Sequence, residues 1–253
     1  MSEEIQVREL LESRAKLLLS YPRYDNVRAE MMVDGMAEMG IESVLLQGPH
    51  IISGFPVLGK GHTGLVMIAR LGSEFVALKL RRVDADRNSL EWEAECLKLA
   101  NDIGVGPKLV IGSQDLLAME LIEGEYLVDW VEGLGEEDTG TLKGVLRELL
   151  VKGWLLDSAG LDHGELSRAY RHIIVSAGGP RIIDFESASN RRRCSNVTSL
   201  AQYFFFNRWM RDAIGKIMEL PERKILLGAL SVYKRAPSRD ALERILVVSG
   251  LTT

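Results

Sequence analysis

The sequence predicts an α+β protein, and three observations carry that prediction. Short apolar runs separated by glycine follow one another from residue 41 to residue 81, a texture typical of antiparallel strands. Apolar residues instead recur near a helical period before residue 40 and again after residue 196. The chain has 253 residues, 46% of them hydrophobic, which is enough to bury a sizeable core in one large domain or in two lobes.

Composition narrows the classes of function. The formal charge of -5 argues against a dedicated nucleic-acid surface, which needs a basic stripe to neutralise phosphates. Cys96 and Cys194 lie far apart and outside any CxxC motif, so they indicate neither a disulfide framework nor a zinc site. The acidic start MSEEIQVREL does not resemble a secretory signal, and no apolar run approaches the roughly 20 residues that span a bilayer. We therefore expect a cytoplasmic monomer without a membrane partner.

Two amphipathic helices are predicted before residue 41. The first runs from Ser2 to Tyr21, where Tyr21-Pro22 stops the pattern. The second begins at Asn26, placed to cap it, and is terminated by Gly40. We expect its apolar stripe to pack into the core rather than to form a partner surface; the stripe comprises Val27, Met31, Met32, Met36 and Met39. Residues 1–50 are thus interpreted as a packed helical extension.

A glycine pattern follows within the strand-rich region. Gly59, Gly61 and Gly64 form a GxGxxGxV motif that ends at Val66. Without side chains at these positions, backbone N–H groups can come close to phosphate oxygens. A strand rather than a long helix follows the motif, which argues against a dinucleotide-binding or P-loop site.

Lys79 lies in the middle of the apolar run Val76-Ala77-Leu78-Lys79, where a charge is costly unless it finds an anion. The predicted helix Ser89–Ile103 offers Glu93 and Glu95 as candidate acidic partners. Two more strands are expected between Lys108 and Leu127, with a break at Glu123-Gly124.

Leu161–Ser189 carries the densest set of reactive side chains. The runs Ile173–Val175 and Arg181–Ile183 predict a hairpin, because glycines and a proline supply the turn between them. The hairpin brings Glu165, before its first strand, near Asp184, after its second. The loop that leads into it carries His163, Glu165, Tyr170 and His172.

The remainder of the chain is predicted to be helical. The basic run Arg191–Arg193 is interpreted as a solvated charge run. Helices are expected at 196–209 and 210–220, from Pro221 as first helical residue to Arg235, and after a cap at Ser238.

The order of these motifs resembles the motif set of eukaryotic-type protein kinases. The motifs are, in chain order, the glycine loop, the lysine strand, the acidic helix, Met119–Ile122, HGELSRAYRHIIV and IIDFESAS. The chain is most similar to the small, archaeal-type RIO-like Ser/Thr kinases over roughly residues 51–200. The resemblance implies a protein-kinase-like two-lobe fold. An antiparallel β N-lobe with one main helix would span 51–122, and a truncated, mostly helical C-lobe 123–253.

The resemblance also implies roles for individual residues. ATP would be bound with Mg²⁺ or Mn²⁺, and the glycine loop would cover its phosphates. Lys79 would contact the α- and β-phosphates, oriented by Glu93 as the first choice and Glu95 as the reserve. Asp184 would hold the metal, and His163 would pack beneath the loop and bond to backbone, as its family counterpart does. Adenine would bond to backbone near Glu120 and Ile122 and lie between Leu58, Val66 and Ala77.

This chain departs from the kinase pattern in three places. Glu165 stands where the family has its catalytic aspartate, and its extra methylene moves the carboxylate by roughly an ångström. Either Tyr170 or His172 takes the place of the metal-binding asparagine. Glu186 replaces the glycine after Asp184-Phe185, and we hypothesise that it supplies the missing metal oxygen, which makes Asp184, Glu186 and His172 the candidate metal ligands.

The leading interpretation is a Ser/Thr protein kinase with Glu165, Lys79 and Asp184 in catalysis, acting on a protein substrate or on itself. The Asp184-Phe185-Glu186 sequence also resembles choline and aminoglycoside kinases, which makes a small-molecule kinase the first alternative. A nucleotide-binding scaffold without catalysis is the second. A nucleic-acid or ribonucleoprotein partner would follow only by analogy with RIO-like proteins.

Overall fold

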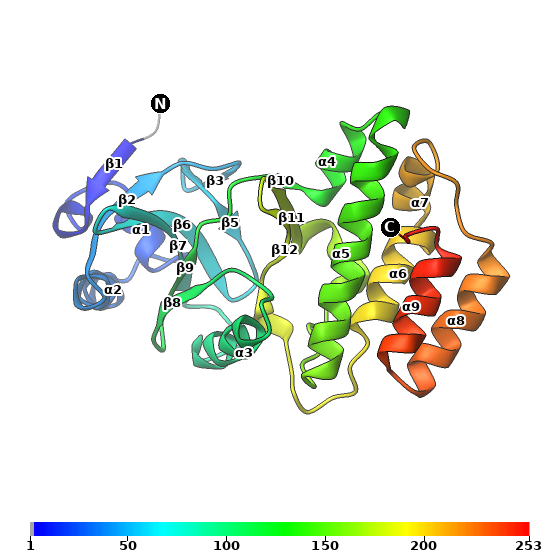
Figure 1. The fold of residues 1–253 in the computed structure, drawn as a ribbon. Coiled ribbons are helices and arrows are strands. Elements are labelled where there is room, and N and C mark those ends of the chain that lie inside the picture. Colours follow the sequence, from blue (N-terminus) through cyan, green and yellow to red (C-terminus); the bar gives the residue numbers. More distant parts are fainter. Residues whose placement is uncertain (1–2, 253) are drawn as a thin grey trace. The chain divides into compact units, whose positions relative to one another are not determined.

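The computed structural model describes residues 3–252 and confirms an α+β protein with a main antiparallel sheet and several helices. The chain forms two compact units. The first consists of the chain up to Glu95 together with Lys108–Leu121, and the second of Cys96–Pro107 and the chain from Ile122 onward. Each unit has its own elements (Figure 1) and is described separately.

The first unit is built on an antiparallel sheet with the strand order β1-β2-β6-β7-β9-β8, to which β5 adds beside β6. A separate hairpin joins β3 to β4. The strands are β1 (Glu3–Gln6), β2 (Ile41–Leu46), β3 (His50–Ile52), β4 (Phe55–Val57), β5 (Gly59–Lys60), β6 (Gly64–Leu71), β7 (Glu74–Arg81), β8 (Leu109–Gly112) and β9 (Leu116–Glu120).

One face of this sheet is apolar and is covered by the N-terminal segment. Alternate residues of a strand point to the same face, so Leu78 and Leu80 of β7 share a face that enters the core. Met32 and Met36 of α2 (Asn26–Glu38) are buried in the same core, as are residues of α1 (Lys16–Leu19) and of the 3-10 turn η1 (Val7–Glu9). The prediction that the apolar stripe of α2 packs into the core is therefore confirmed for Met32 and Met36.

Three predictions for the N-terminal segment are wrong. Ile5 belongs to β1 and pairs with Val44 of β2, so the helix predicted from Ser2 to Tyr21 is a strand at its start; Ser2 itself lies outside the described residues. Asp25, not Asn26, caps α2, because its carboxylate accepts the N–H of Arg28 at 2.7 Å.

The third error concerns the apolar stripe of α2. Val27 and Met31 are 66% and 55% exposed, because the buried face instead runs through Ala29, Met32, Val33 and Met36. The segment over residues 1–50, interpreted as a helical extension, also supplies two strands to the sheet.

The second unit is mainly helical. Its long helix α5 (Thr139–Ser158) packs against α6 (Asn196–Phe206) and α9 (Arg239–Val248), and α9 packs against α8 (Arg223–Arg235), as Figure 1 shows. A three-stranded antiparallel sheet, β10 (Glu125–Tyr126), β11 (Ile173–Ser176) and β12 (Gly179–Ile182), contacts α5 through β12. The remaining elements are α4 (Leu127–Glu132), α7 (Arg208–Ile214), the second half of α3 (Glu91–Asp102) and the 3-10 turns η2 (Glu136–Asp138), η3 (Leu166–Arg171) and η4 (Phe185–Ser187).

The C-terminal helices differ from the prediction at their ends. The helix expected at 196–209 stops at Phe206, because Asn207 is extended and its side chain caps α7 by accepting the N–H of Met210 at 3.1 Å. Pro221 is not the first helical residue, since α8 begins at Arg223. The predicted cap at Ser238 is confirmed: its hydroxyl accepts the N–H of Ala241 at 3.2 Å.

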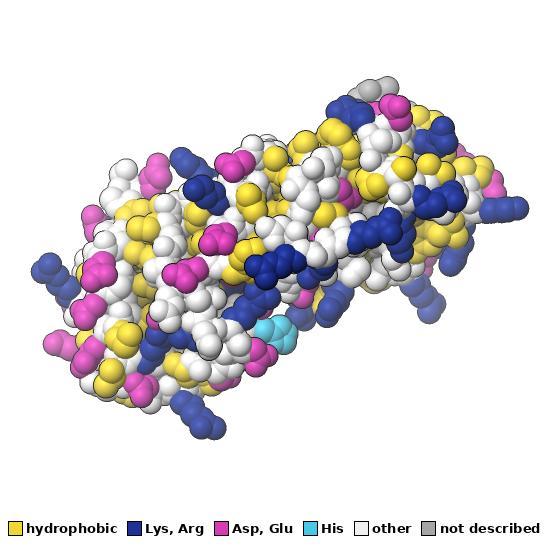
Figure 2. Space-filling view, turned by 90° about the horizontal axis from the view of Figure 1, so that it is seen from below, with side chains coloured by type: hydrophobic (Ala, Val, Ile, Leu, Met, Phe, Trp, Pro, Cys, Tyr) yellow, Lys and Arg dark blue, Asp and Glu magenta, His cyan; other side chains and the backbone are white. Residues whose placement is uncertain are grey.

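Within residues 3–252, none of the helices combines the length and apolar character that a bilayer crossing requires. The chain has 31 basic and 36 acidic residues, and on the face shown in Figure 2 their side chains intermingle with hydrophobic ones. Mixed charges of this kind fit a solvated surface.

Asp115 links α2 to the sheet. Its carboxylate accepts bonds of 2.6 Å from both Arg28 of α2 and Arg81 of β7. Burial acts to raise the pKa of Asp115, but the two arginines outweigh it and hold the pKa below the ordinary value of 3.8. Because the native state favours the charged form, this carboxylate stabilises the fold above that value and loses its contribution as the pH falls through the lowered pKa.

We expect Asp115→Asn to lower the free energy of unfolding at pH 7 by about 2 kcal/mol, since two arginines lose their charged acceptor. Urea unfolding between pH 2 and pH 8 measures the effect, and the gap to the wild type should close at the acid end. Asp84→Asn is the matched control, because Asp84 pairs with Arg82 while 44% exposed and should matter little. Equal losses for both variants would contradict this account.

Candidate functional site

The sheet face opposite the apolar core carries most of the residues predicted to bind a nucleotide. Val66 of β6 lies directly opposite Lys79 of β7 and also opposite Gly59 of β5, so the three form one row across the strands. Ala77 precedes Lys79 by two positions and therefore points to the same face. Strand register thus groups Gly59, Val66, Ala77 and Lys79 around one patch.

Lys79 forms a buried ion pair with Glu93. The ammonium lies 2.8 Å from both carboxylate oxygens, and the two residues are only 3% and 4% exposed. Glu93 lies in the first turn of α3, whereas Glu95, the reserve candidate, is exposed. The pairing anticipated from the apolar strand is thus present, and it involves the first-choice glutamate.

The glycine motif forms a tight hairpin beside this pair. Gly61 donates its N–H to the carbonyl of Gly64 at 2.8 Å, which closes the turn between β5 and β6. A Cβ at Gly64 would lie 2.8 Å from Cγ of Lys79 and 2.9 Å from the carbonyl oxygen of Leu80. Gly64 is therefore needed because the backbone of β6 runs against the lysine side chain.

The remaining predicted nucleotide contacts lie at the end of β9. Glu120 is the last residue of that strand, and its backbone and carboxylate both bond to the backbone of Lys108. Ile122, two positions later, belongs to the second unit. The first unit ends at Leu121, two residues before the predicted break at Glu123-Gly124.

In the second unit, the start of α6 holds the loop that carries the reactive residues. The Asn196 side chain accepts the N–H of His163 at 2.9 Å and donates to the carbonyl of Leu161 at 2.8 Å. Asp157 of α5 in turn accepts bonds from Asn196 and from the hydroxyl of Tyr233 at 2.8 Å. Burial raises the pKa of Asp157 despite these donors.

Asp162 and Arg192 form a second anchor of the same loop. Arg192 donates through Nε to the Asp162 carboxylate, and its terminal nitrogen donates to the carbonyl of Ser187 at 2.6 Å. Asp162 also accepts the N–H of Ser195 at 2.9 Å and exchanges two backbone bonds with Ser189. The sequence analysis interpreted Arg191–Arg193 as a solvated charge run. For Arg192 that interpretation is wrong, because its side chain bonds to Asp162 and Ser187.

His163 is fully buried beneath the loop, as predicted. Its Nε2 lies 3.0 Å from the carbonyl oxygen of Ile183 and its ring packs edge-on against Phe185. Burial first, and then the charge of His172, lower the pKa of His163 to about 4. The ring is neutral at pH 7 and donates from Nε2, because a carbonyl can only accept. Its role is structural.

Glu165 is held at both carboxylate oxygens. Oε2 lies 2.8 Å from Nε2 of His172, and Oε1 accepts the Ser187 hydroxyl at 3.1 Å. His172 is buried, and its Nδ1 lies 3.7 Å from Oδ2 of Asp184. Tyr170 is 39% exposed and stacks with Arg171 instead. Of the two residues considered for the asparagine position, His172 is thus the one placed beside the carboxylates.

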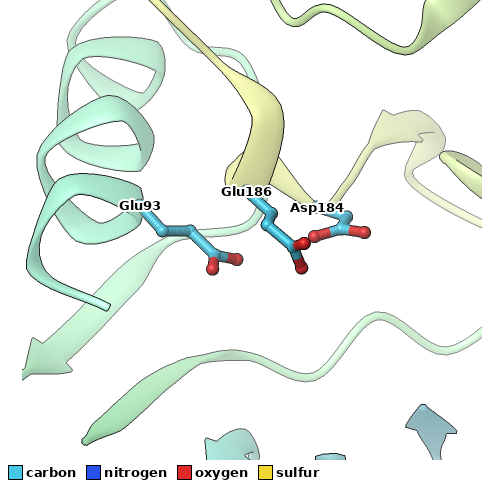
Figure 3. A group of neighbouring side chains, drawn as sticks. All are labelled: Glu93, Asp184 and Glu186. Atoms are coloured by element: carbon cyan, nitrogen blue, oxygen red, sulfur yellow. The ribbon is translucent and has the colours of Figure 1, made fainter. Parts of the chain in front are cut away.

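Asp184 and Glu186 lie close together in the turn after β12. Their carboxylates offer oxygen atoms within 4.8 Å of each other and point toward one another in Figure 3, which also labels Glu93 in the first turn of α3. Asp184 has φ of 65° and ψ of 78°, a left-handed conformation that a non-glycine residue adopts at a cost on the order of 1 kcal/mol or more. Such strain is typical of functional sites.

Phe185 fixes the turn that carries this acidic pair. It is 1% exposed, and a Cβ at Gly106 would lie 2.9 Å from its ring. The donor set fits a divalent cation that favours hard oxygen ligands, because two carboxylates can reach one ion with a small side-chain movement. The nearby nitrogen of His172 suits Mg²⁺ poorly.

Sequence analysis missed the residues that hold the loop. Asp157, Asp162, Arg192 and Asn196 were not singled out for this role, since each makes its bonds to residues distant in the chain. One signal was available: Ser195-Asn196 precedes an apolar helix, the position where polar side chains bond to backbone.

Comparison with known proteins adds nothing to these observations, because neither a protein-family model nor a curated protein sequence matches the chain.

Glu93→Ala should lower the free energy of unfolding by about 3 kcal/mol or more, because it leaves the Lys79 ammonium buried without its carboxylate. Glu95→Ala, two residues further along the same helix and exposed, should change it by less than about 0.5 kcal/mol. Urea unfolding of both variants at pH 7 measures the difference. Similar values would mean that the ion pair does not support the fold.

Proposed function

We propose that this chain is an ATP- and Mg²⁺-dependent phosphotransferase of the protein-kinase-like type, acting on Ser or Thr of a protein. The observation that carries the proposal is the buried Lys79–Glu93 pair beside the glycine hairpin. Burying an ammonium costs several kcal/mol and adds little net stability even when the ion is paired. The presence of such a pair is explained if Glu93 orients the Lys79 ammonium toward the phosphate oxygens of a nucleotide.

The first unit would bind the nucleotide. Lys79 contacts the α- and β-phosphates, and the hairpin Gly59–Gly64 places backbone N–H groups around the phosphates. Val66 and Ala77, on the same sheet face as Lys79, lie against the adenine ring. The backbone near Glu120 and Ile122 bonds to the base. Support comes from strand register, which puts Gly59, Val66, Ala77 and Lys79 on one patch.

The second unit would supply the catalytic carboxylates. Asp184 and Glu186 hold the cation, and a divalent cation bound there neutralises charge on the phosphates. Glu165 accepts the proton of the acceptor hydroxyl, and His172 and Ser187 fix its longer side chain in place. The second unit corresponds to a truncated helical lobe like that of RIO-like kinases, whereas the paired strands β1 and β2 are an addition to the first.

A second candidate is a nucleotide-binding protein without transfer. Both oxygens of Glu165 already accept hydrogen bonds within the chain, which favours a structural role for this carboxylate. The carboxylate of Glu186 beside Asp184 keeps a small-molecule kinase of the choline or aminoglycoside type as a further alternative.

Incubation of the protein with γ-labelled ATP and Mg²⁺ or Mn²⁺ tests the proposal. We expect label on the protein or on an added protein acceptor, and Asp184→Ala should abolish it because the cation loses its main ligand. Turnover only with added small hydroxyl compounds would favour the small-molecule alternative. Nucleotide binding by calorimetry without any transfer would favour the scaffold, and absence of binding would refute all three.

Glu186→Ala tests the second metal ligand separately. We expect Mn²⁺ affinity, followed by electron paramagnetic resonance, to fall on the order of tenfold, since one of two carboxylate ligands is removed. Glu125→Ala is the control, because this exposed acid lies in the same unit and should leave the affinity unchanged. An unaltered affinity in Glu186→Ala would leave Asp184 without this partner.

A further inference from the structure

We propose that Ser187 is a phosphorylation site that the protein modifies on its own chain, with Glu165 as the base. This inference rests on the proposed phosphotransferase function and names an acceptor for it. The hydroxyl that receives a phosphoryl group must lie on the catalytic base, close to the metal-binding aspartate. Ser187 is hydrogen-bonded to Glu165 and lies in the turn that directly follows Asp184.

The hydroxyl of Ser187 is hydrogen-bonded to the carboxylate proposed as the general base. It donates to Oε1 of Glu165 at 3.1 Å, within the range for proton transfer to a general base. It follows Asp184 by three residues in the turn η4, whose backbone is fixed by the Ala188 N–H bonded to the carbonyl of Phe185 at 3.0 Å. A preformed contact of this kind removes the entropic cost of bringing the acceptor to the base.

Other serines of the region lack this arrangement. The hydroxyl of Ser189 accepts the backbone N–H of Arg191 at 3.1 Å, and the hydroxyl of Ser195 donates to Asp162. The partner of the Ser189 hydroxyl is a backbone N–H rather than a carboxylate. The carboxylate that the Ser195 hydroxyl contacts is neutralised by Arg192. Ser187 is therefore distinguished by its partner rather than by being a loop serine.

Arg192 provides a counter-charge for the product. Its terminal nitrogen donates to the backbone carbonyl of Ser187 at 2.6 Å, and its side chain is 44% exposed. A phosphate on Ser187 carries close to two negative charges at neutral pH, and a guanidinium nearby can bond to its oxygens. The same arginine lies beside Gly164, where an added Cβ would fall 2.9 Å from its Cζ atom.

The reaction is a single displacement at phosphorus. Oγ of Ser187 forms a bond to the γ-phosphorus of ATP while the bond from that phosphorus to the β,γ-bridging oxygen breaks, and ADP leaves with the electron pair. The hydroxyl proton passes to Glu165 and then to solvent. Products are phosphoserine, ADP and a proton, so no other reactant is needed.

The modification limits itself. Once Ser187 carries a phosphate it no longer donates to Glu165, and a dianion stands beside that carboxylate. Because the acceptor already contacts the base of its own chain, the rate per molecule should not depend on protein concentration.

Peptide mass spectrometry after incubation with ATP and Mg²⁺ tests the inference. We expect phosphate on Ser187, at a fractional rate that stays constant over a hundredfold dilution. Ser187→Ala should abolish that phosphopeptide, Ser187→Thr should move the phosphate to threonine, and Ser189→Ala should leave it unchanged. Glu165→Gln should slow the step by about 10²-fold or more.

Two measurements keep the variants interpretable. Thermal unfolding shows whether each variant folds, and calorimetric ATP affinity in Ser187→Ala should match the wild type, since Ser187 is not a nucleotide contact. Transfer to another residue or to an added protein, with Ser187 unmodified, would overturn the inference and leave the proposed function intact. Failure to bind ATP would overturn both.

Discussion

The first unit depends on one constraint, the ammonium of Lys79 inside the sheet. A charge excluded from water needs an opposite charge nearby. Glu93 supplies it, because both of its carboxylate oxygens lie 2.8 Å from the Lys79 ammonium. This requirement ties the first turn of α3 to the face of β7 and keeps that face polar at its centre. The opposite face is free to be apolar, and the N-terminal helices cover it with methionine and leucine. The sheet thus has one apolar face that packs against the core and one face that carries a buried ion pair.

In the second unit, the loop that carries Glu165 and His172 needs bonds that hold it in place. The segment between Asp184 and α6 is short, so these bonds come from the start of α6 itself. Hydrogen bonds to the start of α6 do this: Asn196 bonds to the backbone on both sides of Asp162, and the Asp162 carboxylate binds Arg192. Asp162 and Asn196 are buried, so each would otherwise be a buried polar group in need of a partner. Glu165 consequently sits on a fixed frame, and the length of its side chain is absorbed by bonds to neighbours.

The sequence predicted well those features that depend on local pattern and poorly those that depend on distant partners. Strands β6 and β7, the hairpin β11–β12 and the burial of His163 follow from alternation, turn residues and the motif order. Ile5 looked helical because short apolar spacings fit either period, and only pairing with β2 makes it a strand. Helix α5 was not anticipated although leucines recur along it at helical spacing. At the site, spacing alone could not separate Tyr170 from His172, because the choice depends on which side chain the fold buries.

The pairing of β1 with β2, and of β2 with β6, bears on where this protein can be cut. A chain that began at the glycine-rich strands would keep Gly59, Val66, Ala77 and Lys79, the residues proposed to bind the nucleotide. It would also leave residues Ile68–Leu71 of β6 without a hydrogen-bonding neighbour on one side and strip the helices from the apolar face. An unprotected strand edge beside bare apolar surface is a template for aggregation. The segment before β3 therefore protects both the edge of β6 and the apolar face of the sheet. A shortened chain that is to remain folded and unaggregated should keep this segment.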